Sequence, residues 1–166
     1  MFYTFLDYLT RLHRRLAATH PITLFLLFFA AEVIYSISTS LLVTAIDPTL
    51  TETNLQTTHL IQTFIVTVIF GPIAETIVFQ FLLIEGLLAL RLRIGFVITI
   101  AAVLFAATHH YNWVYVVVML FSGLAYGYYY WLLRRWSITE AFLWVLLLHA
   151  SWNFIAFLNN DVLEWF

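Results

Sequence analysis

The sequence contains no cysteine and no lysine, and it has few charged residues of any kind. The lack of cysteine excludes disulfide bonds, a thiolate nucleophile and cysteine-based metal sites. Charged residues make up 10% of the 166 residues, whereas a soluble domain has about 25%. A chain that is 63% hydrophobic could not cover its core with a polar surface. We therefore predict an all-α integral membrane protein that forms a single domain, residues 1–166, and has no basic tract for nucleic acid.

Long apolar segments dominate the chain and predict a bundle of about five transmembrane helices. As a continuous helix the second segment would be about 54 Å long, against a hydrocarbon core of ~30 Å. Proline at position 72 removes a backbone donor. We therefore expect a kinked second segment, with a polar helix near 55–70 and a crossing helix near 72–90, although a double crossing of 55–90 stays open. The five segments are residues 22–46, 55–90, 94–110, 114–133 and 138–158.

The arginines predict the orientation of the chain in the membrane. With one crossing per segment, all of them fall on one side, which places the N-terminus inside and the C-terminus outside. Residues 2–18 read as an amphipathic helix that lies in the interface and directs its apolar side toward the bilayer. That side comprises Phe2, Phe5, Leu6, Leu9, Leu12 and Leu16, and the arginines are Arg11, Arg14, Arg15, Arg91, Arg93, Arg134 and Arg135.

Three apolar segments carry polar residues at similar predicted depth. Counting from the nearest arginine at ~1.5 Å per residue, Glu75 and His109 lie about 24 Å, His149 about 21 Å and Asn153 about 27 Å from the arginine side. Ionisable residues inside a membrane are rare and mark functional sites. Glutamate can take a proton from water, and histidine and asparagine can hydrogen-bond an oxyanion. The sequence therefore predicts a shared site in the half of the bilayer away from the arginines.

Four short motifs, in order over residues 72–153, resemble the CPBP family of intramembrane CAAX-processing endoproteases, bacteriocin self-immunity proteins and abortive-infection proteins. The family pattern is roughly P-x-x-E-E-x-x-F-R, F-x-x-x-H, a glycine- and aromatic-bearing helix, and H-x-x-x-N. The family-like core would cover residues 55–158. The matching residues are Pro72, Glu75 and Phe79, then Phe105 and His109, then Phe121, Gly123, Gly127 and Tyr130, then His149 and Asn153.

The resemblance implies a glutamic intramembrane endopeptidase. Glu75 and His109 would activate a water, and His149 and Asn153 would bind the oxyanion of a lipidated or membrane-embedded peptide. The first motif is degenerate, because Thr76 and Gln80 stand where the family has a second glutamate and an arginine. The alternative is therefore a catalytically inactive protein of the same fold that acts as a chaperone, an immunity factor or an integral subunit of a larger membrane complex. The arginine count places the predicted site toward the outer side of the membrane, whereas CAAX processing occurs on the cytosolic side. Either the topology is therefore inverted, or the substrate is not a CAAX protein.

Other polar residues allow further interpretations. The peptidase requires no cofactor, but Glu75, His109 and His149 have the ligand types of a zinc site. The chain lacks the H-E-x-x-H spacing that would indicate zinc strongly, and a pigment or haem on a histidine stays open. We interpret Glu32 as a buried partner for another polar group. Glu85, six residues before Arg91, reads as structural near the arginine side.

Overall fold

The computed structural model describes residues 2–47 and 59–163, and side chains from residue 7 onward. The segment between them, with the Asp47-Pro48 break and the predicted start of the second apolar segment, lies outside the described residues. The N-terminal helix α1, Phe2–Ala18, is followed by α2, Pro21–Ile46. Proline suits the first position of α2 because the N–H that it lacks would have no partner there. The side chain of His20 caps this helix by accepting from the Ile22 N–H at 3.3 Å.

One helix of 30 residues, Leu60–Ala89, forms the second span, and we call it the long helix. It consists of α3 Leu60–Phe64, the π-helical η2 Ile65–Phe70, α4 Gly71–Glu75, the π-helical η3 Thr76–Leu82 and α5 Leu83–Ala89. The prediction that Pro72 separates two helices is wrong. The π-helical turns on both sides keep the backbone helical through the proline, so the described part of this segment is one continuous helix long enough to span a membrane.

The remaining helices form an up-and-down array after the long helix. They are α6, Ile94–Thr108, α7, Trp113–Leu133, and α8, Ile138–Phe157, which continues into the π-helical η4, Leu158–Leu163. Within the described residues, four helices are long and apolar enough to cross a membrane, namely α2, the long helix, α7 and α8 with η4. At 15 residues, α6 is a shorter apolar helix. The chain is therefore a multi-pass, all-helical membrane protein.

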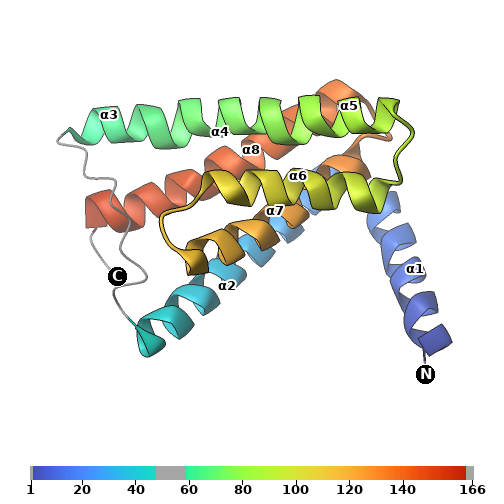
Figure 1. Cartoon of the computed structure of the whole chain (residues 1–166), viewed down its shortest axis with the longest axis horizontal. Coiled ribbons are helices and arrows are strands. Elements are labelled where there is room, and N and C mark those ends of the chain that lie inside the picture. Colours follow the sequence, from blue (N-terminus) through green and yellow to red (C-terminus); the bar gives the residue numbers. More distant parts are fainter. Residues whose placement is uncertain (1, 48–58, 164–166) are drawn as a thin grey trace.

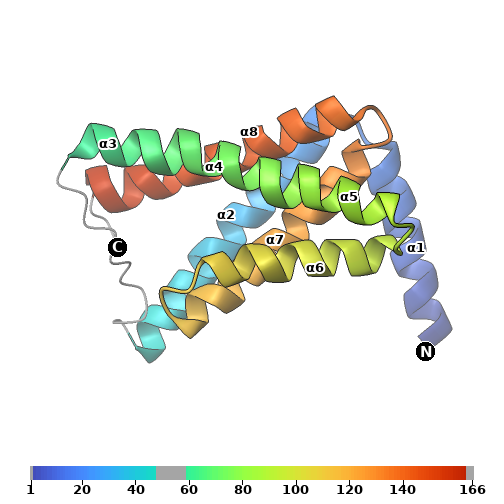
Figure 2. The same ribbon diagram turned by 45° about the horizontal axis from the view of Figure 1, so that its top comes forward.

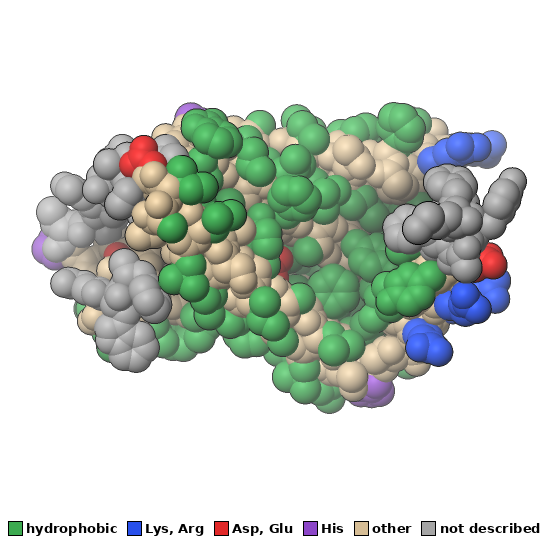
Figure 3. Space-filling view, turned by 90° about the horizontal axis from the view of Figure 1, so that it is seen from below, with side chains coloured by type: hydrophobic (Ala, Val, Ile, Leu, Met, Phe, Trp, Pro, Cys, Tyr) green, Lys and Arg blue, Asp and Glu red, His purple; other side chains and the backbone are tan. Residues whose placement is uncertain are grey.

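The helices α5–α8 meet α1 at one end of the bundle, which we call the arginine end (Figure 1). The turns α5–α6 and α7–α8 lie there and carry Arg91, Arg93, Arg134 and Arg135. Figure 3 shows blue side chains at this end of the visible face and a broad hydrophobic belt along its middle. At the other end, α3 and η4 extend beyond the turn between α6 and α7 (Figure 2). The arginines of these two turns thus lie at one end of the bundle, as the sequence predicts.

Helix α1 leaves the bundle at a steep angle to the spans (Figure 1). Its apolar residues Tyr8, Leu9 and Leu12 are exposed, while Leu16 packs against the core. A hydrogen-bond contact of 2.9 Å joins His13 Nδ1 to the Tyr128 hydroxyl. This arrangement suits a helix in the membrane interface.

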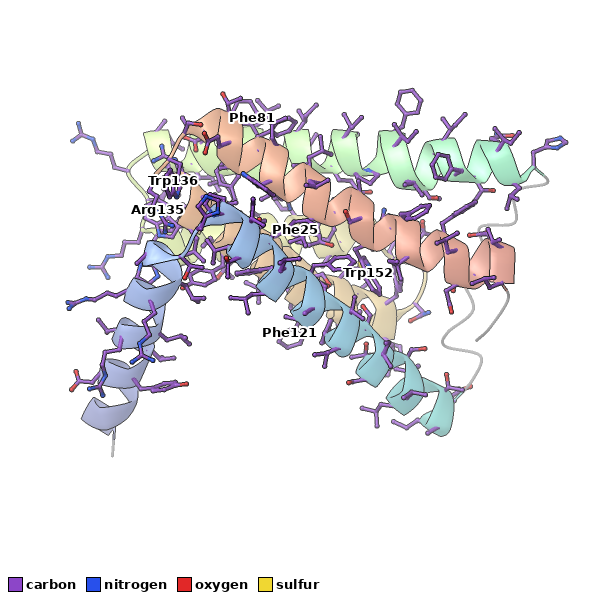
Figure 4. The ribbon with its side chains drawn as sticks, turned by 180° about the vertical axis from the view of Figure 1, so that it is seen from behind. Phe25, Phe81, Phe121, Arg135, Trp136 and Trp152 are labelled. Atoms are coloured by element: carbon purple, nitrogen blue, oxygen red, sulfur yellow. The ribbon has the colours of Figure 1, made fainter. Side chains whose placement is uncertain are left out.

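The α7–α8 turn reaches the junction of α1 and α2. Arg135 donates to the Thr19 carbonyl at 2.9 Å and lies over the Trp136 ring, and Figure 4 shows both residues beside this junction. The contact fixes the interfacial helix to the end of the transmembrane bundle.

The core lies where α6, α7 and α8 meet. Tyr126, Tyr129 and Tyr130 are fully buried on one face of α7. Glycines on the same helix let α6 approach: a Cβ at Gly123 would lie 3.0 Å from the Ala102 Cα, and one at Gly127 would lie 3.0 Å from Ile98 Cγ2. Small residues permit such close packing between membrane helices. The tight α6–α7 pair brings the end of α6 to a fixed place beside α8.

A polar clamp closes the bundle at the arginine end. Arg134 donates to both carboxylate oxygens of Glu85, at 2.6 and 2.8 Å, and the Tyr130 hydroxyl donates to the same group at 2.9 Å. The partners of Glu85 are thus Tyr130 on α7 and Arg134 directly after it, whereas Arg91 lies in the α5–α6 turn with a left-handed φ of 60°. The structural interpretation of Glu85 agrees with this clamp.

Candidate active site within the membrane

Glu75 is the last residue of α4, one turn after Pro72, and it faces two histidines from other helices. Its Oε1 lies 3.9 Å from His109 Nε2, and its Oε2 lies 3.4 Å from His149 Nε2. The Glu75 side chain is partly buried, with 29% of its surface exposed. The structure therefore brings Glu75, His109 and His149 together.

His109 is placed by the end of α6. The helix stops at Thr108, and His109 has φ −100° and ψ 46°, outside the helical region. Its Nδ1 lies 2.9 Å from the Phe105 carbonyl, which can only accept, so Nδ1 carries the proton and donates. In the neutral ring Nε2 is then an unprotonated acceptor, and this is the nitrogen that faces Glu75.

The 3.9 Å between His109 Nε2 and Glu75 Oε1 is too long for a direct hydrogen bond. A separation of this size is suited to a shared water. Such a water could donate one hydrogen to the imidazole and the other to the carboxylate. The pair can therefore hold and deprotonate a water molecule.

His149 lies on α8 and is buried. Its ring lies between two aromatic rings, with centroid distances of 5.0 Å to Tyr126 and 5.9 Å to Phe105. Its Nδ1 lies 3.4 Å from the Thr76 hydroxyl, so its two nitrogens face consecutive residues of the long helix. The aromatic walls fix the ring plane, and the contacts with Glu75 and Thr76 fix its rotation.

Asn153 lies one turn beyond His149 on α8, beside the cluster. Its Nδ2 donates to the backbone carbonyl of Thr67 at 2.8 Å. Among the described contacts, none joins its side chain to Glu75, His109 or His149. The structure thus brings three of the four predicted residues together and places the fourth against the backbone of the long helix.

A second intramembrane carboxylate lies outside this cluster. Glu32 on α2 is 3% exposed, and it accepts from the Ser122 hydroxyl of α7 at 3.2 Å. Its interpretation as a buried partner for another polar group is confirmed. Ser122 is one turn from Tyr126 on α7, so this contact joins α2 to the helix that packs against His149.

Sequence reasoning missed several residues that shape the site. Thr76 appeared only as a departure from a motif, yet its hydroxyl contacts His149. The sequence did not single out Tyr126 or Thr67, because predicting that they contact the site would require knowing how their helices are rotated. Among the residues that the structure describes, no group of three or more acidic or histidine side chains is arranged to hold a metal ion.

This fold and this polar cluster define a helical membrane protein with a Glu–His–His site inside the bilayer. A family profile described as "Type II CAAX prenyl endopeptidase Rce1-like" matches residues 57–155. The match covers more than half of the chain, and the chain therefore belongs to this family. It confirms the CPBP resemblance read from the four motifs. No curated protein and no solved structure matches the chain.

Proposed function

We propose that this protein is an intramembrane endopeptidase in which Glu75 activates a water molecule. The observation that carries the proposal is the position of the Glu75 carboxylate between two imidazoles from two other helices. Membership of a family described as prenyl endopeptidases supports it. The substrate class is a membrane-associated peptide, lipidated or embedded in the bilayer.

In the reaction, a water held by Glu75 and His109 attacks the carbonyl carbon of the scissile peptide bond. Glu75 takes the water's proton and passes it to the departing amine, so that the products are a new carboxylate and a free amine. With substrate bound, the His149 Nε2–H, which faces Glu75 at 3.4 Å in this structure, would donate to the tetrahedral oxyanion. Asn153 would complete this pair through its second amide hydrogen, because the first is donated to Thr67.

A hydrolysis assay in detergent micelles tests the proposal, because substrate can reach the protein from either side in a micelle. Two fluorogenic reporters, one with a prenylated C-terminal CAAX sequence and one apolar transmembrane peptide, separate lipidated from embedded substrates. Cleavage in H₂¹⁸O should place one labelled oxygen in the new carboxylate, and Glu75→Gln should abolish it while the thermal unfolding curve is kept. Unchanged cleavage in that variant would remove Glu75 from the mechanism.

The second candidate is a catalytically inactive member of the same fold. Two departures favour it: Thr76 and Gln80 are uncharged, and the Gln80 Oε1 is buried with no hydrogen-bond partner among the described residues. Such a protein would act as a chaperone, immunity factor or complex subunit. It predicts a stoichiometric partner after purification in mild detergent, and a cellular effect that survives Glu75→Gln.

A further inference from the structure

The backbone ladder of the long helix loses a donor at Pro72, and this affects the Thr67 carbonyl. In a π-helix each N–H bonds to the carbonyl five residues earlier, and the Gly71 N–H does so with Val66. In that register the donor for the next carbonyl, Thr67, is residue 72. Proline has no N–H. The Thr67 carbonyl therefore needs a partner from outside the helix.

Asn153 supplies this partner. Its Nδ2 donates to the Thr67 carbonyl at 2.8 Å across the interface with α8. The Thr67 hydroxyl is not available for its own carbonyl, since it donates to the Thr63 carbonyl at 2.8 Å. An unsatisfied backbone group in a bilayer costs several kcal/mol. The contact is thus specific to a helix that carries proline at position 72.

We propose that Asn153 is a positioning residue that replaces the missing N–H of Pro72 and so sets the register between α8 and the long helix. The same two helices meet again at Glu75 and His149, where Oε2 and Nε2 lie 3.4 Å apart. Two contacts at separate points fix both the sliding and the rotation of one helix against the other. The effect of this positioning on catalysis rests on the proposed function, whereas the contact between Asn153 and Thr67 does not.

A double-mutant cycle between Asn153 and residue 72 tests this inference. Pro72→Ala restores a backbone N–H, and the Thr67 carbonyl then regains a donor in either the α or the π register. Asn153→Leu, which removes the amide at similar volume, should lower the thermal midpoint by about 4 °C when residue 72 is proline, and by about 1 °C or less when it is alanine. An equal loss in both backgrounds would overturn the inference.

Asn159→Leu is the matched control, because Asn159 lies further along the same helical stretch and donates to Asn160. Its effect should be the same with proline or alanine at position 72. Asn153→Ala serves the cycle if the leucine variant does not fold, since the cost of the small void cancels between backgrounds. A control that depends on residue 72 as strongly as Asn153 does would also overturn the inference.

The ring of His149 provides a readout that a merely stabilising contact would not move. In protein with ¹⁵N-labelled histidine, Asn153→Leu should shift the His149 signal, and the added Pro72→Ala should return it. Cleavage should fall at least about tenfold in Asn153→Leu and recover only in part when Pro72→Ala is added, because the second amide hydrogen proposed for the oxyanion is still missing. No recovery at all would contradict the positioning role. If the wild-type protein cleaves neither reporter, the proposed function is contradicted. The thermal midpoints of the double-mutant cycle would still test the contact between Asn153 and Thr67.

Discussion

Two carboxylates on the long helix, Glu75 and Glu85, are in opposite situations. Glu85 is held by a guanidinium through two short bonds and by a tyrosine hydroxyl. Glu75 faces two histidines at 3.4 and 3.9 Å, and no arginine contact with it is described. A carboxylate paired with arginine keeps its charge and its place. One that faces neutral imidazoles can exchange a proton, so the first carboxylate is structural and the second is suited to chemistry.

After Glu75 itself, the largest expected effect on turnover is at the histidine that shares the proposed water. His109→Gln keeps a polar group of similar reach but removes the basic Nε2. Turnover should fall by about 10²–10⁴-fold, the range of general acid–base catalysis. The reporter assay measures it. Turnover within threefold of wild type would show that the 3.9 Å separation is only a packing distance.

The clamp at the arginine end should respond in the opposite way. Arg134→Met leaves the Glu85 carboxylate without its cation, and we expect the free energy of unfolding to fall by about 2 kcal/mol for this partly exposed pair. Cleavage at a temperature where the variant stays folded should be unchanged. Denaturant titration in mixed micelles measures the loss.

The double change Glu85→Gln with Arg134→Met is the control for this clamp. Removing both partners should restore most of the lost stability, because no unpaired charge then remains. A double variant as unstable as Arg134→Met alone would mean that packing, rather than charge, holds this end together.

The smallest expected effect concerns the third carboxylate, Glu32. Ser122→Ala removes the donor at 3.2 Å and should lower the free energy of unfolding by about 1 kcal/mol. Ser151→Ala on α8 is a control of the same chemistry, since no hydrogen bond of Ser151 is described. If Ser122→Ala lowers the free energy of unfolding no more than the control does, the hydrogen bond from Ser122 to Glu32 does not stabilise the protein.

The sequence was sufficient to predict the class of protein and the three polar residues that the structure brings together. Helices rise by a constant amount per residue, so counting from arginines at a shared boundary placed Glu75, His109 and His149 at one depth. Their contact then required only that the helices be neighbours. The four ordered motifs contain the same residues, and the family match covers the part of the chain that carries these motifs.

Features that depend on helix rotation or backbone register could not be predicted. The partner of Glu85 is Arg134, which is distant in sequence, and spacing along one segment cannot reveal a contact between helices. Pro72 was expected to divide its segment, but π-helical turns on both sides keep the helix continuous through the proline. The bond from Asn153 to Thr67 follows from that register, so the sequence alone could not have indicated it.

A side-by-side comparison of Glu75→Gln and Glu85→Gln tests the central claim most directly. Each variant replaces one carboxylate of the same helix with its neutral isostere, and turnover and thermal midpoint are measured on the same samples. We predict that Glu75→Gln abolishes turnover and keeps the midpoint, whereas Glu85→Gln lowers the midpoint by about 4 °C and keeps turnover. Equal effects of the two substitutions on turnover would contradict the assignment of chemistry to Glu75.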